Sequence, residues 1–123
     1  MTKIVLWVSD MDAQAIFYSR LLGVEQVIRE PGFAELSSET NCLLLHELPE
    51  DYRASVPLTA QLNAQQEVAI KPVFVVTDIS AARENISATL GTIQGSEKSY
   101  GASTYLDVVD PEGNIIQLEQ RAN

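Results

Sequence analysis

Cysteine is almost missing from this sequence, which excludes the class of small proteins that are held together by disulfides. Cys42 is the only cysteine, so the chain cannot form an internal disulfide. Proteins without disulfides are usual in reducing compartments, and we therefore expect a cytoplasmic location. We interpret Cys42, which lies in the apolar segment NCLLLHE, as an inert buried thiol.

Positive charge is scarce too. Eight Lys and Arg residues stand against seventeen Asp and Glu residues, which gives a net charge of -9. A surface of this sign repels the phosphates of nucleic acids and anionic membranes, so we expect neither as a partner. By the same argument, the charge weakly favours a cationic ligand.

Long apolar runs are also missing. The stretch near the N-terminus, Ile4–Val8, ends at Ser9 and Asp10 and is too short for the apolar core of a signal peptide. No segment approaches the roughly 20 apolar residues that a membrane-spanning helix needs. The 123 residues are enough for one domain with its own apolar core.

What the sequence does contain is an internal repeat. Residues 3–23, KIVLWVSDMDAQAIFYSRLLG, align without a gap with residues 71–91, KPVFVVTDISAARENISATLG, when Asp10 is placed on Asp78. Each copy predicts a short strand, an aspartate that starts a helix, an amphipathic helix, and a glycine that ends it. Agreement in register over a whole segment indicates a duplicated structural unit.

Each copy is followed by three further strand-like segments separated by turns. In the second half, the segment DPEGN, residues 110–114, predicts a type I turn in which Gly113 takes a positive φ. Both halves therefore predict the order β-α-β-β-β. The second half is longer, and we expect its extra residues in a loop around residues 95–101.

These elements predict one α+β domain with module one at residues 1–47, a linker at residues 48–69, and module two at residues 70–121. The linker is rich in Glu, Gln and Ala and is long for a compact domain. We expect it either to hold a helical turn, around residues 58–66, or to reach across to another subunit.

The segments VSD and FYSRLLG, together with the ending YLDVVDPEGNIIQLEQ, resemble the vicinal oxygen chelate superfamily of glyoxalases, bleomycin resistance proteins and extradiol dioxygenases. The resemblance covers nearly the whole chain outside the linker. It implies two tandem βαβββ modules whose mixed sheets form a cup, the glyoxalase/bleomycin-resistance fold. It also implies that the first and fourth strands of each module present the ligands of a divalent metal.

Other side chains occupy the positions of those metal ligands in this sequence. By the resemblance, the positions correspond to Lys3, Leu44, Lys71 and Gln117. Leucine has no donor atom, and lysine ammonium groups repel a divalent ion. Zinc and iron favour imidazole or thiolate ligands, and hard ions favour several carboxylates. We therefore expect no metal and no other cofactor.

The alternation of side chains along strands predicts what lines the cup instead. The candidate ligand contacts are Lys3, Trp7, Glu35, Leu44, His46, Lys71, Tyr105, Asp107 and Gln117. The lysines either pair with Glu35 and Asp107, or one of them meets an anionic group of a ligand. Trp7 is either plain core or a stacking platform, and His46 is expected to be partly exposed rather than a base. Gln117 is the favoured contact because its amide needs hydrogen-bond partners.

Different functions are compatible with these expectations. The first is metal-independent binding of a small organic molecule, such as sequestration of a drug or metabolite, with the ligand unidentified. The alternative is a metal-dependent glyoxalase-like lyase or dioxygenase that uses non-standard ligands. A third is a scaffold whose cup has closed. We expect a homodimer, with the modules paired within a chain or swapped between chains.

Overall fold

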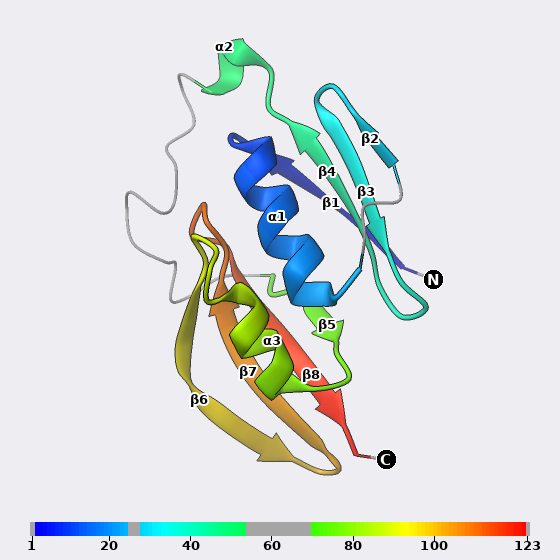
Figure 1. Ribbon diagram of the computed structural model, residues 1–123, viewed down its shortest axis with the longest axis vertical. Helices are drawn as coiled ribbons and strands as arrows, with labels where there is room; N and C mark the ends of the chain where they lie inside the picture. The colour runs from blue at the N-terminus through cyan, green and yellow to red at the C-terminus, as the bar shows by residue number, and fades with distance from the viewer. Residues whose placement is uncertain (1, 25–27, 54–69, 123) are drawn as a thin grey trace.

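The computed structural model describes residues 2–24, 28–53 and 70–122, and the structural statements below refer to these residues (Figure 1). The helical turn expected around residues 58–66 lies outside them. Module one consists of β1 (Lys3–Val8), α1 (Met11–Leu22), β2 (Ile28–Glu30), β3 (Phe33–Ser37) and β4 (Cys42–Glu47), and a short helix, α2 (Glu50–Arg53), follows it. Module two consists of β5 (Val73–Val75), α3 (Ile79–Ile86), β6 (Thr92–Tyr100), β7 (Ser103–Val109) and β8 (Ile115–Arg121).

Each module folds into one four-stranded mixed sheet, and the two sheets have equivalent strand orders. The order is β1-β4-β3-β2 in module one and β5-β8-β7-β6 in module two. The strands β1 and β4 run parallel, as do β5 and β8, whereas the other neighbours are antiparallel. This topology confirms the α+β fold class and the repeated βαβββ unit.

Both long helices begin at the predicted aspartates. The side chain of Asp10 accepts a hydrogen bond from the backbone N–H of Ala13 at 3.1 Å, and that of Asp78 accepts one from Ser80 at 2.8 Å. These bonds satisfy N–H groups that the first helical turn leaves unpaired. α1 also ends as predicted at Gly23, whose φ of 66° lies in the left-handed region.

The second long helix is shorter than the repeat predicts. α3 ends at Ile86, and the Thr89 hydroxyl donates a hydrogen bond of 2.7 Å to the carbonyl of that last residue. Gly91 therefore does not end the helix. A glycine is needed there because the ring of Phe17 from α1 stands where a Cβ atom would lie. No helix in the described part of the chain has the length and apolar content of a membrane span.

The strand β6 replaces the loop that we expected around residues 95–101. It pairs with β7 up to Tyr100, and its extra residues produce a register shift between Gln94 and Lys98. Gly95, with a φ of 75°, lies within this bulge. Pairing along β7 satisfies backbone groups that a loop would leave to water, which explains the longer strand.

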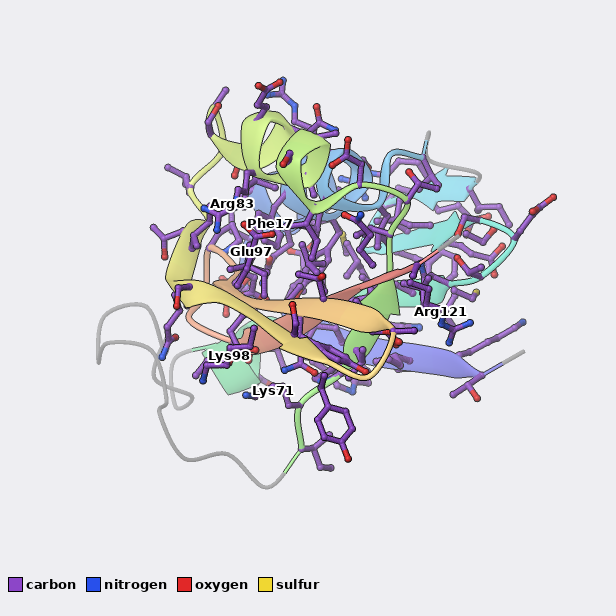
Figure 2. All side chains as sticks on the ribbon, turned by 90° about the horizontal axis from the view of Figure 1, so that it is seen from below. Phe17, Lys71, Arg83, Glu97, Lys98 and Arg121 are labelled. Carbon is purple, nitrogen blue, oxygen red and sulfur yellow. The ribbon has the colours of Figure 1, made fainter. Side chains whose placement is uncertain are left out.

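Each sheet is covered by helices on one face only. The covered faces supply core residues, namely Val8, Ala34, Leu36, Leu43 and Leu45 in module one and Phe74, Leu106, Val108, Ile116 and Leu118 in module two. We call the opposite face of each sheet its open face. Figure 2 shows Lys71 and Lys98 on the open face of module two, on the far side of the sheet from α3.

The two modules pack against each other through their helices, in a contact that we call the module seam. α1 lies beside α3 (Figure 1), and the rings of Tyr18 and Phe74 are 6.2 Å apart. The carboxylate of Glu112 accepts hydrogen bonds of 3.0 Å from the backbone N–H groups of Ser9 and Asp10. The start of α1 is thus held by a turn of the other module.

Asp110 is the centre of a buried hydrogen-bond network at the module seam. Its carboxylate, in a residue only 2% exposed, accepts hydrogen bonds from the Tyr18 hydroxyl at 2.7 Å and the Gln14 amide at 3.0 Å. Burial raises the pKa of the Tyr18 hydroxyl, and the nearby Asp110 carboxylate raises it further. The predicted turn is present, with Gly113 at a φ of 87°, but this network was not anticipated.

Candidate functional site

The open face of module one brings together the side chains that strand alternation predicted for it. Cross-strand pairing places on this face Lys3, Val5 and Trp7 from β1, Cys42, Leu44 and His46 from β4, and Phe33 and Glu35 from β3. Val5 and Trp7 are 49% and 54% exposed, so Trp7 is not part of the core. Large apolar side chains grouped on an exposed face are typical of a binding surface.

An aromatic cluster lies on this face near the C-terminal end of β1. The ring of His46 lies 5.1 Å from that of Trp7 and 5.0 Å from that of Phe33, the second contact being edge to face. His46 is half-buried between its neighbours, in agreement with the predicted partly exposed histidine. The rings are inclined to one another by 44° and 72°, so the cluster offers aromatic surface to a ligand but not one continuous plane.

The open face of module two is polar, and its predicted ion pair is present. The ammonium group of Lys71 lies 2.9 Å from one carboxylate oxygen of Asp107, and the Gln117 amide donates a 3.1 Å hydrogen bond to the other. Both charged side chains are about one-third exposed, at 36% and 27%. These three predicted site residues therefore form one connected group.

The equivalent pair in module one is not formed. Within the described residues, Lys3 makes no ion pair with Glu35, although both lie on the same open face. The register places Glu35 beside Leu44 in the neighbouring strand, whereas Lys3 lies beside Cys42. Lys71 has the same offset from Asp107, so the register does not separate the two pairs. The lysines differ in that Lys3 belongs to β1, whereas Lys71 precedes β5, which begins at Val73.

Tyr105 contacts Glu119, which is not among the predicted site residues. Its hydroxyl lies 3.4 Å from the carboxylate of Glu119, which also accepts a 2.7 Å hydrogen bond from the hydroxyl of Ser103. The bond from Ser103 lowers the pKa of Glu119, and the nearby Arg121 lowers it further. Glu119 stands two positions after Gln117 on β8 and therefore lies on the same face of the sheet.

A hollow of about 340 Å³ lies on the open face of module two. It is lined by Lys71, Gln94, Gly95, Ser96, Lys98, Tyr105, Asp107 and Gln117. The bulge in β6 lies along its edge and contributes Lys98, which the sequence analysis missed because it assigned this segment to a loop. An unusual glycine inside a strand-like segment, Gly95, is the signal that could have indicated the bulge.

The residues at the family's metal positions do not fit a metal ion. Lys71 and the amide nitrogen of Gln117 are both engaged with Asp107, and Leu44 offers only hydrocarbon. Within residues 2–24, 28–53 and 70–122, no three His, Cys, Asp or Glu side chains are grouped as metal ligands. The amide oxygen of Gln117 by itself is a weak donor.

A second cavity, of about 400 Å³, lies between the modules rather than over an open face. It is lined mainly by apolar side chains, with Ile4 and Leu6 from β1 on one side and Pro72 and Phe74 on the other. None of the described residues that line it is charged. It therefore offers little polar chemistry for orienting a ligand, and the open faces remain the better candidate site.

Comparison with protein families gives one match over most of the chain. A family model described as the Glyoxalase/Bleomycin resistance protein/Dioxygenase superfamily matches residues 1–118. Among curated proteins no relative matches the sequence.

Several solved structures have the same fold. A glyoxalase/bleomycin resistance protein/dioxygenase family enzyme from Burkholderia phytofirmans PsJN superposes with a TM-score of 0.69 at 19% identity, over 97% of this chain and 96% of that one. A glyoxalase/bleomycin resistance protein from Albidiferax ferrireducens T118 has a TM-score of 0.72 at 16% identity, over 98% of both chains. A bleomycin resistance determinant encoded on the transposon Tn5 has a TM-score of 0.62 at 21% identity, over 98% and 97%. These likenesses show a shared fold, and fold alone does not assign an activity.

Proposed function

Because the chain belongs to the Glyoxalase/Bleomycin resistance protein/Dioxygenase superfamily, we propose that it is a metal-independent binding protein for a small organic molecule. The observation that carries the proposal is the aromatic cluster of Trp7, His46 and Phe33 on the open face of module one, in which Trp7 is 54% exposed. The lysines and leucine at the metal positions favour binding over metal-dependent chemistry.

The role that we propose is sequestration of a drug or metabolite in the cytoplasm. One structural relative is described as a bleomycin resistance determinant, so bleomycin is a natural first compound to test. The predicted contacts are the open-face residues of both modules, Lys3, Trp7, Glu35, Leu44, His46, Lys71, Tyr105, Asp107 and Gln117.

The proposed site is shared between two copies of the chain. The modules meet through α1 and α3, and Val5, Trp7 and Val73 remain at least 44% exposed, so the open faces do not cover each other within one chain. A second copy can place its module two over the module one of the first. A two-fold dimer would then contain two equivalent sites.

The test uses the only tryptophan of the chain as a reporter, because Trp7 lies in the proposed site. A panel of small aromatic compounds and bleomycin is titrated while Trp7 emission is followed, and the mass in solution is measured by light scattering. We expect saturable emission changes and a dimer. Leu44→Arg should abolish the emission change by placing a long charged side chain on the open face.

Leu90→Arg is the matched control, because Leu90 is 74% exposed on the loop after α3, away from the open faces. It should bind as the wild type does. A monomer in solution would overturn the shared site, and an emission change that Leu44→Arg leaves intact would place binding elsewhere. Binding that requires added zinc or manganese would refute metal independence.

A further inference from the structure

We propose that the hollow in module two binds an oxyanion, such as a carboxylate or sulfonate, carried by a ligand whose planar ring stacks on Trp7. The inference rests on the proposed function, since it assigns chemistry to the two halves of that site. The evidence for the oxyanion site is the distribution of charged side chains over the open faces.

The distribution of lysine is the first observation. The chain has only three lysines, Lys3, Lys71 and Lys98, in a protein of net charge -9. Lys3 lies on the open face of module one, and the other two line the hollow in module two. An acidic protein thus places every ammonium group where the ligand is proposed to bind, which favours an anion at that point.

Lys98 is the ammonium group that is available to a ligand. Within the described residues it makes no ion pair, whereas Lys71 is paired with Asp107. The neighbouring Glu97 pairs with Arg83 of α3 at 3.2 Å, and Figure 2 shows Arg83 and Glu97 on the other side of the sheet from Lys98. The described residues that line the hollow therefore carry two ammonium groups and one carboxylate, an excess of one positive charge.

The acidic groups near the hollow are already engaged and do not compete for Lys98. The oxygens of Asp107 accept from Lys71 and Gln117, while Glu119 accepts from Ser103 and lies 3.5 Å from the Arg121 guanidinium. An incoming oxyanion can thus bind Lys98 directly. It can also share the Lys71 ammonium with Asp107, since an ammonium group has three N–H donors.

The bulge in β6 gives module two a feature that the described part of module one does not share. Between the paired positions Gln94–Asp107 and Lys98–Tyr105, β6 has more residues than β7, so β6 arches away from its neighbour. The equivalent strand of module one, β2, is described from Ile28 to Glu30, and over these residues it pairs with β3 without a register shift. Module one therefore contributes the ring surface and module two contributes the anion site.

The test compares three compounds with the same ring and different charges, namely 2-naphthoate, 2-naphthalenemethanol and 2-naphthylmethylammonium. Isothermal calorimetry on the 123-residue chain measures each affinity at two salt concentrations. We expect 2-naphthoate to bind about tenfold more tightly than the alcohol, and the ammonium compound to bind most weakly. Added salt should weaken only the binding of 2-naphthoate.

Variants then locate the anion contact. Lys98→Gln should weaken 2-naphthoate about tenfold and leave the alcohol unchanged, because it removes the free charge without changing the ring surface. Arg20→Gln is the control, since it changes the net charge equally at an exposed position on α1. It should leave all three affinities unchanged.

The outcomes separate this inference from the proposed function. If none of the three compounds binds, the proposed function fails and the oxyanion site fails with it. If the alcohol or the ammonium compound binds as tightly as 2-naphthoate, binding by the open faces stands and the oxyanion site is overturned. The same conclusion follows if Lys98→Gln has no effect, or no more effect than Arg20→Gln.

Discussion

Module one and module two repeat the same strand order, and their open faces have different chemistry. In module one the face is built around the rings of Trp7, His46 and Phe33, and its Lys3 and Glu35 do not pair. In module two the equivalent charges, Lys71 and Asp107, lie 2.9 Å apart beside a polar hollow. The two modules therefore share a strand order but not the chemistry of their open faces.

At the module seam, the turns that precede the last strand of each module, β4 and β8, also differ in chemistry. In module one, Asn41 pairs with the backbone of Val75 in the other module through bonds of 2.8 Å and 3.3 Å. In module two, Glu112 binds the backbone at the start of α1, and Asp110 binds Tyr18. Each turn contacts the opposite module, one with a neutral amide and the other with buried carboxylates.

The largest expected effect concerns this pair of turns. Asp110→Ala would leave the Tyr18 hydroxyl and the Gln14 amide buried without their partner, and we expect it to lower the free energy of unfolding by about 4 kcal/mol. Asn41→Ala should cost only about 1 to 2 kcal/mol, because it removes neutral hydrogen bonds. Urea denaturation measures both. Equal losses of unfolding free energy would contradict the prediction that the buried carboxylate stabilises the module seam more than the neutral amide does.

The equivalent glycines of the repeat form the second comparison. Gly91→Ala forces a Cβ atom into the ring of Phe17 and should cost about 3 kcal/mol through overpacking. Gly23→Ala should cost about 1 kcal/mol, since no atom lies within 4 Å of its Cβ position and only the φ of 66° opposes it. Thermal unfolding can rank the two variants. A larger loss at Gly23 would mean that backbone strain outweighs packing at the module seam.

Glu112 and Glu119 of module two should contribute to stability with opposite dependence on pH. Burial raises the pKa of Glu112, although the backbone N–H groups of Asp10 and Ser9 partly counteract it. The native state thus holds this proton more tightly, so the contribution of Glu112 to stability falls as pH rises from about 4.5 through the raised value. The pKa of Glu119 is lowered, so its contribution is present above about 4.5 and is lost as pH falls through the lowered value.

Urea unfolding of Glu112→Gln and Glu119→Gln from about pH 3 to about pH 7 checks these signs. The stability of the wild type relative to Glu112→Gln should decrease as pH rises. Relative to Glu119→Gln it should increase. If both stability differences changed with pH in the same direction, the predicted contrast between Glu112 at the module seam and Glu119 on the open face would be wrong.

The smallest expected effect is that of the ion pair between Lys71 and Asp107, which is about one-third exposed. A double-mutant cycle of Lys71→Met and Asp107→Asn should give a coupling of about 0.5 kcal/mol, because solvent screens a pair at this exposure. The matched cycle of Lys3→Met and Glu35→Gln should give a coupling near zero. Similar coupling energies in the two cycles would contradict the prediction that only module two has this ion pair.

Much of this molecule could be predicted because the relevant signals are local. Side-chain direction in a strand depends only on odd or even position, so the open-face residues of the correctly predicted strands followed from the sequence, whereas Lys98 on β6 did not. The helix starts at Asp10 and Asp78 followed because a capping carboxylate binds N–H groups two or three residues away. The loop expected around residues 95–101 was wrong because pairing with a distant strand, β7, decides whether that segment extends.

The sequence by itself therefore determined the doubled βαβββ unit, its helix starts and the inward or outward direction of its strand residues. Only the tertiary structure decided which charges meet, since Lys71 pairs with Asp107 while the equivalent Lys3 and Glu35 stay apart. It also decided the seam, where Glu112 binds Ser9 across 103 positions of sequence. Such contacts depend on the distances that packing sets between remote segments, and no local pattern contains those distances.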